Sequence, residues 1–270
     1  MLFLHFSLFI ISCGSKDSQV NKDAVGMENL IGLDFTQSER DTLLPGLQVL
    51  KDQYDTLRTV ALDNSVPVPL YFDPRIPGQK LPMGDDAYLF QEFPTKRPDN
   101  IEECAFYTIG QLAHLIRTRQ VTSLELTIMY LERLKRHGPM LECVVTLTEE
   151  LALEQARRAD KNIKAGRYLG PLHGIPYGAK DLLAVPGYKT TWGAMSHKNQ
   201  ILDETATVVQ KLEDAGAVLV AKLTLGALAW GDVWYGGKTR NPWNTEDGSS
   251  GSSAGPGSAT AAGLVAFAIG

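Results

Sequence analysis

The sequence predicts an α/β fold, because strand-like and helix-like segments alternate along the chain. Three segments have the length and apolar content of buried strands: Val144–Leu147, residues 172–181 and residues 218–221. Helical patterns separate them, over residues 148–165 and 205–215. Since this order of elements buries both faces of a sheet, it favours a sheet flanked by helices.

The N-terminus is a short apolar run, MLFLHFSLFIIS, that ends at Cys13. A helix that spans a membrane needs about 20 apolar residues, and this run is shorter. Its length is typical of a secretory signal. Residues 10–13 resemble a bacterial lipobox, in which signal peptidase cuts before a cysteine that then carries lipid. No Lys or Arg precedes the run, so an ordinary signal peptide is the alternative. We expect residues 1–13 to direct export to the bacterial cell envelope, with lipid on Cys13 as an anchor on the periplasmic or surface side.

Residues 14–107 carry no recognisable chemistry. Residues 14–28 are polar and are predicted to be a tether, followed by an extension over residues 29–107. Within it, leucines and a tyrosine recur every three or four positions and predict a helix over residues 29–63, with a break at Pro45-Gly46. Residues 66–100 are rich in proline and predict irregular structure.

The main domain is predicted to begin at Thr108. Thr108 with Gln111, and Thr122 with Glu125, have the spacing of capping boxes and predict two helix starts. Gly138-Pro139 is expected to end the second of these helices.

Composition excludes several classes of function. The 270 residues have a formal net charge of −5, which argues against nucleic acid as a partner. The three cysteines have no metal-ligand spacing, and the five histidines form no HExxH-type cluster. We therefore expect neither a metal nor a cofactor.

A Ser- and Gly-rich stretch, GSSGSSAGPGSATAAGLVAFAIG, occupies residues 248–270. It lacks the lysine of a phosphate-binding GxxxxGK[ST] loop. A flexible linker would not lead into the apolar residues 264–269, and Pro256 suits the first turn of a helix. A structural turn and a loop that presents catalytic hydroxyls and amides both remain open from this stretch alone.

The extended segment LHGIPYGAKD, residues 172–181, carries a lysine at its next-to-last position. Lys180 closes an apolar strand, and Leu182 and Leu183 follow after Asp181, so the sequence indicates that Lys180 is buried. Burial favours the neutral amine, and a neutral amine can act as a general base. Asp181 is expected to cap a turn, with hydrogen bonding to the lysine loop as the alternative.

Together, GIPYGAKD, GAVLVAKLTLGALAWG from Gly216, and NPWN followed by GSSGSSAG resemble the amidase signature family. The resemblance covers roughly residues 108–270 and implies a mixed sheet flanked by helices that is incomplete in this chain. These hydrolases use a Ser-cisSer-Lys triad. The matching positions imply that Lys180 is the base and Ser252 the cis-serine, with Gly251 and Ser253 in the active-site loop.

Two features depart from the family pattern. The family usually reads GGSSGGS where this chain reads GSSGSSAGP, so Ser249 or Ser250 could take the place of Ser252. In addition, the family's nucleophilic serine lies in a TGGS-type segment that follows the AIG of residues 268–270. We therefore expect the nucleophile about six residues beyond Gly270, and we expect the 270 residues alone to be inactive.

The sequence thus predicts an amidase that hydrolyses the carbon–nitrogen bond of a small-molecule amide. One alternative is a non-catalytic or truncated lipoprotein homologue. Another is the family's amidotransferase subunit, which acts on aminoacyl-tRNA; the export signal and the acidic charge argue against it. The sequence identifies neither the substrate nor the oligomeric state. Four tryptophans could line a pocket or belong to the core: Trp192, Trp230, Trp234 and Trp243.

Overall fold

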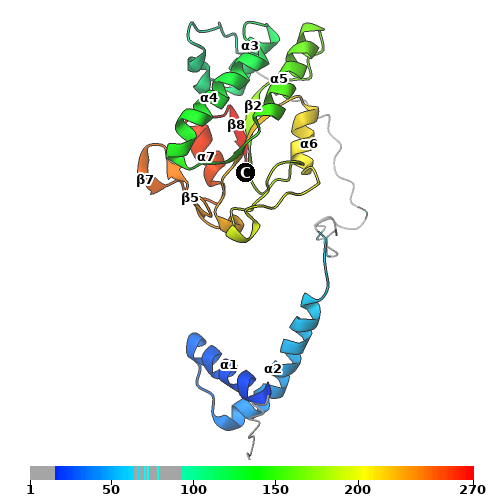
Figure 1. Cartoon of the computed structure of the whole chain (residues 1–270), viewed down its shortest axis with the longest axis vertical. Helices are drawn as coiled ribbons and strands as arrows, with labels where there is room; N and C mark the ends of the chain where they lie inside the picture. The colour runs from blue at the N-terminus through cyan, green and yellow to red at the C-terminus, as the bar shows by residue number, and fades with distance from the viewer. Residues whose placement is uncertain (1–15, 64–65, 67–69, 71, 73–77, 79–92) are drawn as a thin grey trace, which may run out of the picture. The chain divides into compact units, whose positions relative to one another are not determined.

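A four-stranded mixed sheet organises the second half of the chain (Figure 1). The computed structural model describes residues 16–63, 66, 70, 72, 78 and 93–270. The chain divides into two units, Met1–Gly84 and Asp85–Gly270, and each is described by itself. Thr108, the expected start of the main domain, lies inside the second unit. Cys13 and the rest of the expected signal segment lie outside the described residues.

In the first unit, two helices are held together by a buried ion pair. Helix α1 spans Lys16–Ile31 and helix α2 spans Gln37–Arg58. Glu28 is 2% exposed, and its carboxylate accepts hydrogen bonds from the guanidinium of Arg40 at 2.8 to 3.1 Å. Because a buried carboxylate needs a partner, this contact fixes the turn between the helices.

The first unit corrects two expectations. Residues 16–28, predicted to be a polar tether, belong to α1. The helix predicted over residues 29–63, with a break at Pro45-Gly46, is instead the end of α1 and the whole of α2. Helix α2 begins with a Thr36–Glu39 capping box and continues through Pro45. Proline removes one backbone donor, and the remaining hydrogen bonds of this 22-residue helix are enough to carry it past that point.

The second unit begins its regular structure with the 3₁₀ helix η1 (Ile101–Phe106) and helices α3 (Ile109–Arg117) and α4 (Ser123–Leu141). Both predicted capping boxes are present, at the starts of α3 and α4. Helix α4 passes the expected end at Gly138-Pro139 and stops at Leu141, before Glu142, which takes a left-handed conformation with φ of 49°. A proline in the last turn removes only one donor, so it does not end the helix.

The sheet has the strand order β1-β3-β2-β8. Its strands are β1 (Val144–Leu147), β2 (Pro176–Lys180), β3 (Val218–Leu223) and β8 (Phe267–Ile269). Strand β2 runs parallel to both β3 and β8, and β1 runs antiparallel to β3. The mixed sheet and the three predicted strand segments are therefore confirmed.

Helices α5 (Glu149–Lys164), α6 (Thr207–Asp214) and α7 (Ala254–Ala261) complete the layers. One buried cluster packs α4, α5 and α7 against β3, and it includes Leu264 and Val265. A second cluster packs α6 beside Tyr177 and Ala179 of β2. The sheet thus has helices on both of its faces, as Figure 1 shows. Residues 264–269, the apolar end of the Ser- and Gly-rich stretch, are buried at Leu264 and Val265 and half-buried over β8.

The connection from β3 to α7 consists of short elements. They are the 3₁₀ helix η3 (Ala227–Ala229), the pair β4 (Val233–Trp234) and β5 (Gly237–Lys238), and the pair β6 (Arg240–Asn241) and β7 (Asn244–Gly248). A further 3₁₀ helix, η2 (Met195–His197), lies between β2 and α6. In the described ranges, no helix combines the length and the apolar content that crossing a bilayer requires.

Gly178 in β2 tests the packing of the sheet that carries Lys180. A Cβ atom at this position would overlap Cδ1 of Leu223, a fully buried side chain of β3. We expect Gly178→Ala to lower the free energy of unfolding by about 1–3 kcal/mol, because overpacked cores force strain on their neighbours. Urea unfolding followed by circular dichroism measures this change.

Gly257 in α7 provides the matched control, since a Cβ atom there meets nothing within 4 Å. Gly257→Ala should leave stability unchanged or raise it by up to about 1 kcal/mol, because alanine restricts the unfolded chain. Equal stability of Gly178→Ala and the wild type would show that Leu223 can move aside.

Candidate functional site

The side chain of Lys180 lies at the end of β2 and is 5% exposed. Its Nζ lies 3.0 Å from Oγ of Ser252 and 2.9 Å from Oγ of Ser253. Burial lowers the pKa of this amine from its ordinary value of 10.5, because desolvation disfavours the ammonium form. No carboxylate within the described residues offsets that effect on the pKa of Lys180.

Both serines lie on the loop that leads into α7. Ser253 occupies the position before the helix, and the peptide bond between Gly251 and Ser252 is cis. The N–H of Gly255 donates to the carbonyl of Thr224, just beyond β3, at 3.0 Å. This bond holds the start of α7 against the end of the sheet, so the two hydroxyls meet Lys180.

Gly251 is required where the loop passes close to another segment. A Cβ atom at this position would overlap the carbonyl oxygen of Gly231. The N–H of Ser250 donates to the carboxylate of Asp232 at 3.1 Å, which holds the same two segments together. Only glycine permits this close approach of two backbones.

The structure brings together Lys180, Ser252 and Ser253, and it places Ser249 and Ser250 elsewhere. The hydroxyl of Ser249 donates to the carbonyl of Ser250 at 3.1 Å, and both residues are exposed or half-buried at the loop surface. The cis bond and the contact with the lysine therefore both fall on Ser252.

Gly270 lies beside the same three residues. Ile269 of β8 is paired with Ala179, the residue before Lys180. A Cβ atom on Gly270 would lie 2.7 Å from Oγ of Ser253. Position 270 is thus next to Ser253, one of the two hydroxyls that contact Lys180.

Asp181 does not cap a simple turn, as the sequence suggested. Its carboxylate is fully buried, and Oδ1 lies 2.8 Å from Nζ of Lys222. The other oxygen accepts hydrogen bonds from the N–H, at 2.8 Å, and from the hydroxyl of Thr191. The alternative expectation, that Asp181 bonds to the loop that follows the lysine, describes the second of these contacts.

Lys222 is a buried charged residue that the sequence analysis did not single out. It stands within the apolar run of β3, where a lysine has no access to water. A lysine inside an otherwise apolar strand was the available signal, because a buried cation requires an acidic partner. The partner itself comes from another strand and could not be read from local sequence.

The four tryptophans are not core residues. Trp230 and Trp243 are 86% and 80% exposed, while Trp192 and Trp234 are half-buried. None of them contacts Lys180 through a hydrogen bond in the part of the chain that the structure describes.

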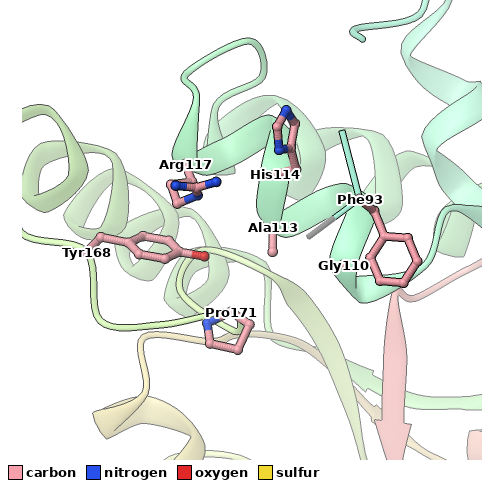
Figure 2. Close-up of a pocket in the computed structure, with 7 residues that line it drawn as sticks. All are labelled: Phe93, Gly110, Ala113, His114, Arg117, Tyr168 and Pro171. Atoms are coloured by element: carbon pink, nitrogen blue, oxygen red, sulfur yellow. The ribbon is translucent and has the colours of Figure 1, made fainter. Parts of the chain in front are cut away.

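Figure 2 shows a pocket of about 170 Å³ that shares no residue with the Lys180 cluster. Phe93, His114 and Tyr168 contribute to its lining, and the hydroxyl of Tyr168 points toward its interior.

Within the described residues, no group of three His, Cys, Asp or Glu side chains is placed to hold a metal ion. Cys104 and Cys143 are buried thiols, and burial raises the pKa of each, to about 11 and about 12.

Comparison with known proteins finds the amidase family over residues 125–270. A glutamyl-tRNA(Gln) amidotransferase subunit from Hahella chejuensis is 40% identical over 167 residues, which are 61% of this chain and 34% of that protein. The peptide amidase of Stenotrophomonas maltophilia is 34% identical in the superposed region, with a TM-score of 0.57 over 62% of this chain and 36% of that one. A fatty acid amide hydrolase superposes with a TM-score of 0.58 at 26% identity, over 62% of this chain and 30% of that one. The chain spans about a third of the length of the curated relatives it matches.

Lys180 should make stability depend on pH above neutrality. Its amine has a lower pKa in the folded than in the unfolded protein, so the unfolded state binds the proton more tightly. The wild type should therefore gain stability as pH rises from the lowered pKa toward 10.5. Lys180→Met lacks this amine and should not show this gain. The free energy of unfolding of Lys180→Met, minus that of the wild type, should therefore be largest at low pH and should fall as pH rises toward 10.5.

Chemical denaturation from pH 6 to pH 11 measures that difference, and Lys198→Met, at an exposed lysine, controls for the loss of a surface amine. A difference between Lys180→Met and the wild type that stays constant with pH would contradict a lowered pKa.

Proposed function

The chain belongs to the amidase signature family, and we propose on that basis that it takes part in hydrolysis of a carbon–nitrogen amide bond. Lys180 is the general base, and Ser252 is the hydroxyl that passes the proton to it. The observation that carries the proposal is the buried amine of Lys180, which lies 3.0 Å from the hydroxyl of the cis-linked Ser252.

The first step requires a serine nucleophile, which the family resemblance assigns to a segment after Gly270. In this proposal its hydroxyl attacks the amide carbon while its proton moves to Oγ of Ser252. Ser252 in turn gives its own proton to the neutral Nζ of Lys180, which becomes an ammonium. The position of Gly270 beside Ser253 supports this assignment, because a segment continuing from Gly270 would start next to that hydroxyl.

The second step releases the amine. The ammonium of Lys180 returns its proton through Ser252 to the leaving nitrogen, which breaks the carbon–nitrogen bond and leaves an acyl-enzyme. Water then attacks the acyl carbon while the same base accepts its proton. The ester bond to the serine breaks, the proton returns to the serine oxygen, and the carboxylic acid leaves. Ser253 also lies within hydrogen-bonding distance of Lys180, and it orients the amine toward Ser252.

A small-molecule amide is the substrate class that fits this proposal. The alternative is an amidotransferase component, and the 40% identity to a glutamyl-tRNA(Gln) amidotransferase subunit favours it. A lipoprotein homologue without catalytic activity is the remaining alternative. Turnover of aryl amides and labelling by a fluorophosphonate serine probe support the amidase. Glutamine-dependent amidation of glutamyl-tRNA supports the amidotransferase, and neither activity supports the inactive homologue.

Replacing Lys180 by arginine should abolish the activity of the full-length protein. A guanidinium remains protonated and cannot accept a proton at the pH of catalysis. We expect Lys180→Arg and Lys180→Ala to lower kcat/KM on an aryl amide by a similar factor, about 10³-fold or more. Lys198→Arg, at an exposed position, should retain wild-type activity. Substantial activity of Lys180→Arg would show that only positive charge is needed.

We also propose that the protein is exported and carries lipid on Cys13. This proposal depends on the sequence of residues 10–13 and not on the described structure. Radiolabelled palmitate fed to a bacterial host should label the wild type and leave Cys13→Ser unlabelled. Equal labelling of the two proteins would contradict lipidation at this cysteine.

A further inference from the structure

A second buried lysine lies one strand away from Lys180. Lys222 of β3 is paired with Ala179 of β2 and has no exposed surface. Its Nζ contacts three acceptors: Oδ1 of Asp181 at 2.8 Å, the carbonyl of Lys189 at 2.8 Å and Oγ1 of Thr190 at 3.1 Å. An ammonium has three N–H donors, so all of them find partners.

These contacts determine the charge of Lys222. Burial is the larger effect and lowers the pKa of its amine from the ordinary value, and the carboxylate of Asp181 opposes it. Three acceptors around Nζ, one of them a carboxylate, favour the ammonium form. Lys222 and Asp181 therefore form a buried pair of opposite charges.

Asp181 directly follows Lys180 in the chain, but its carboxylate lies on the other face of the sheet. Lys222 is in register with Ala179, and side chains alternate between faces along a strand. Lys180 accordingly faces the start of α7, and Asp181 faces Lys222 and Thr191. The candidate base and a buried carboxylate are thus attached to consecutive residues.

We propose that Lys222 is a positioning residue for the chemistry of Lys180. By neutralising Asp181, it prevents that carboxylate from stabilising the protonated form of the neighbouring amine. The proposal deepens the proposed function and rests on it.

The physical reason is the effect of charge on an amine in a poorly solvated site. An unpaired carboxylate favours the ammonium of a nearby lysine, whereas a carboxylate paired with a cation acts only as a weak dipole. The other groups around Asp181 carry no charge. They are Thr190, Thr191 and the phenol of Tyr235, whose hydroxyl bonds to Thr191 and whose pKa is raised by burial. On the other side of the sheet, the groups within the described residues that contact Nζ of Lys180 are the hydroxyls of Ser252 and Ser253.

A purely structural role for the pair predicts a different result from a charge role. Loss of packing would affect Lys180 in the same way whichever partner is removed. Loss of charge compensation would shift the pKa of Lys180 in opposite directions in the two variants. Lys222→Met leaves a carboxylate without its cation, and Asp181→Asn leaves an ammonium without its anion. Thr191 still donates two hydrogen bonds to Asp181 in the first variant.

The test measures the protonation of Lys180 directly in the full-length protein. Brief acetylation with trace acetic anhydride across a pH series, followed by peptide mass spectrometry, reports the fraction of neutral amine at Lys180. We expect Lys222→Met to raise the midpoint of labelling by on the order of one pH unit. Asp181→Asn should lower it, and the double variant should return close to the wild type.

Two outcomes would overturn the proposal: midpoints that do not move, or midpoints that move in the same direction in both single variants. If Lys222→Met fails to fold, Asp181→Asn decides alone, and an unchanged or raised midpoint contradicts the proposal. Labelling needs no hydrolysis, so it is independent of the proposed function. In an active enzyme, the acidic limb of the kcat/KM profile should move in the same direction as the labelling midpoint.

Discussion

The central constraint of this structure is that β2 is buried along its whole length, although its last residue, Lys180, and the residue after it, Asp181, are ionisable. Strands β3 and β8 cover both of its edges, and helices cover both faces of the sheet. Water therefore cannot solvate Lys180 or Asp181 freely. The partners of these two buried groups differ. Asp181 receives a cation and two donors from Thr191, whereas the described partners of the Lys180 amine are hydroxyl groups. The charge of Asp181 is compensated by Lys222, and burial lowers the pKa of Lys180.

The alternation of side chains along β2 keeps these two solutions apart. Asp181 and Lys222 lie on the face that α6 helps to cover, and Lys180 lies on the face where α7 begins. Parallel pairing with β8 also brings Gly270 beside Lys180, because Ile269 is in register with Ala179. Three segments that are distant in the sequence therefore meet at one end of the sheet. They supply the amine from β2, the two hydroxyls from the loop before α7, and the backbone after β8.

Much of this arrangement could be predicted from local sequence. The capping boxes at Thr108 and Thr122 determine helix starts through contacts within four residues, and both are present. Lys180 could be recognised as buried because its flanking residues are apolar. The family resemblance predicted that it acts together with Ser252. The pairing of Lys222 with Asp181 could not be predicted, because it depends on the register of β2 and β3, which shifts between Tyr177 and Gly178. The predicted break at Pro45 and the predicted helix end at Gly138-Pro139 were also wrong, since hydrogen bonds on either side of a proline decide whether the helix continues.

A buried, unpaired lysine lowers the stability of a fold, so its presence needs a reason beyond packing. An apolar side chain of similar length would fill the space without the desolvation of an amine. Lys222 shows what this protein does when a buried lysine has to be charged: it supplies a carboxylate and two further acceptors. Among the described residues, Lys180, one strand away, contacts no carboxylate, and its neighbours are a cis-linked serine and a second hydroxyl. Burial lowers the pKa of both amines, but only Lys222 contacts a carboxylate that opposes this effect. Groups with suppressed charge in partly enclosed sites are where acid–base chemistry is found, because a base must be uncharged before it can accept a proton.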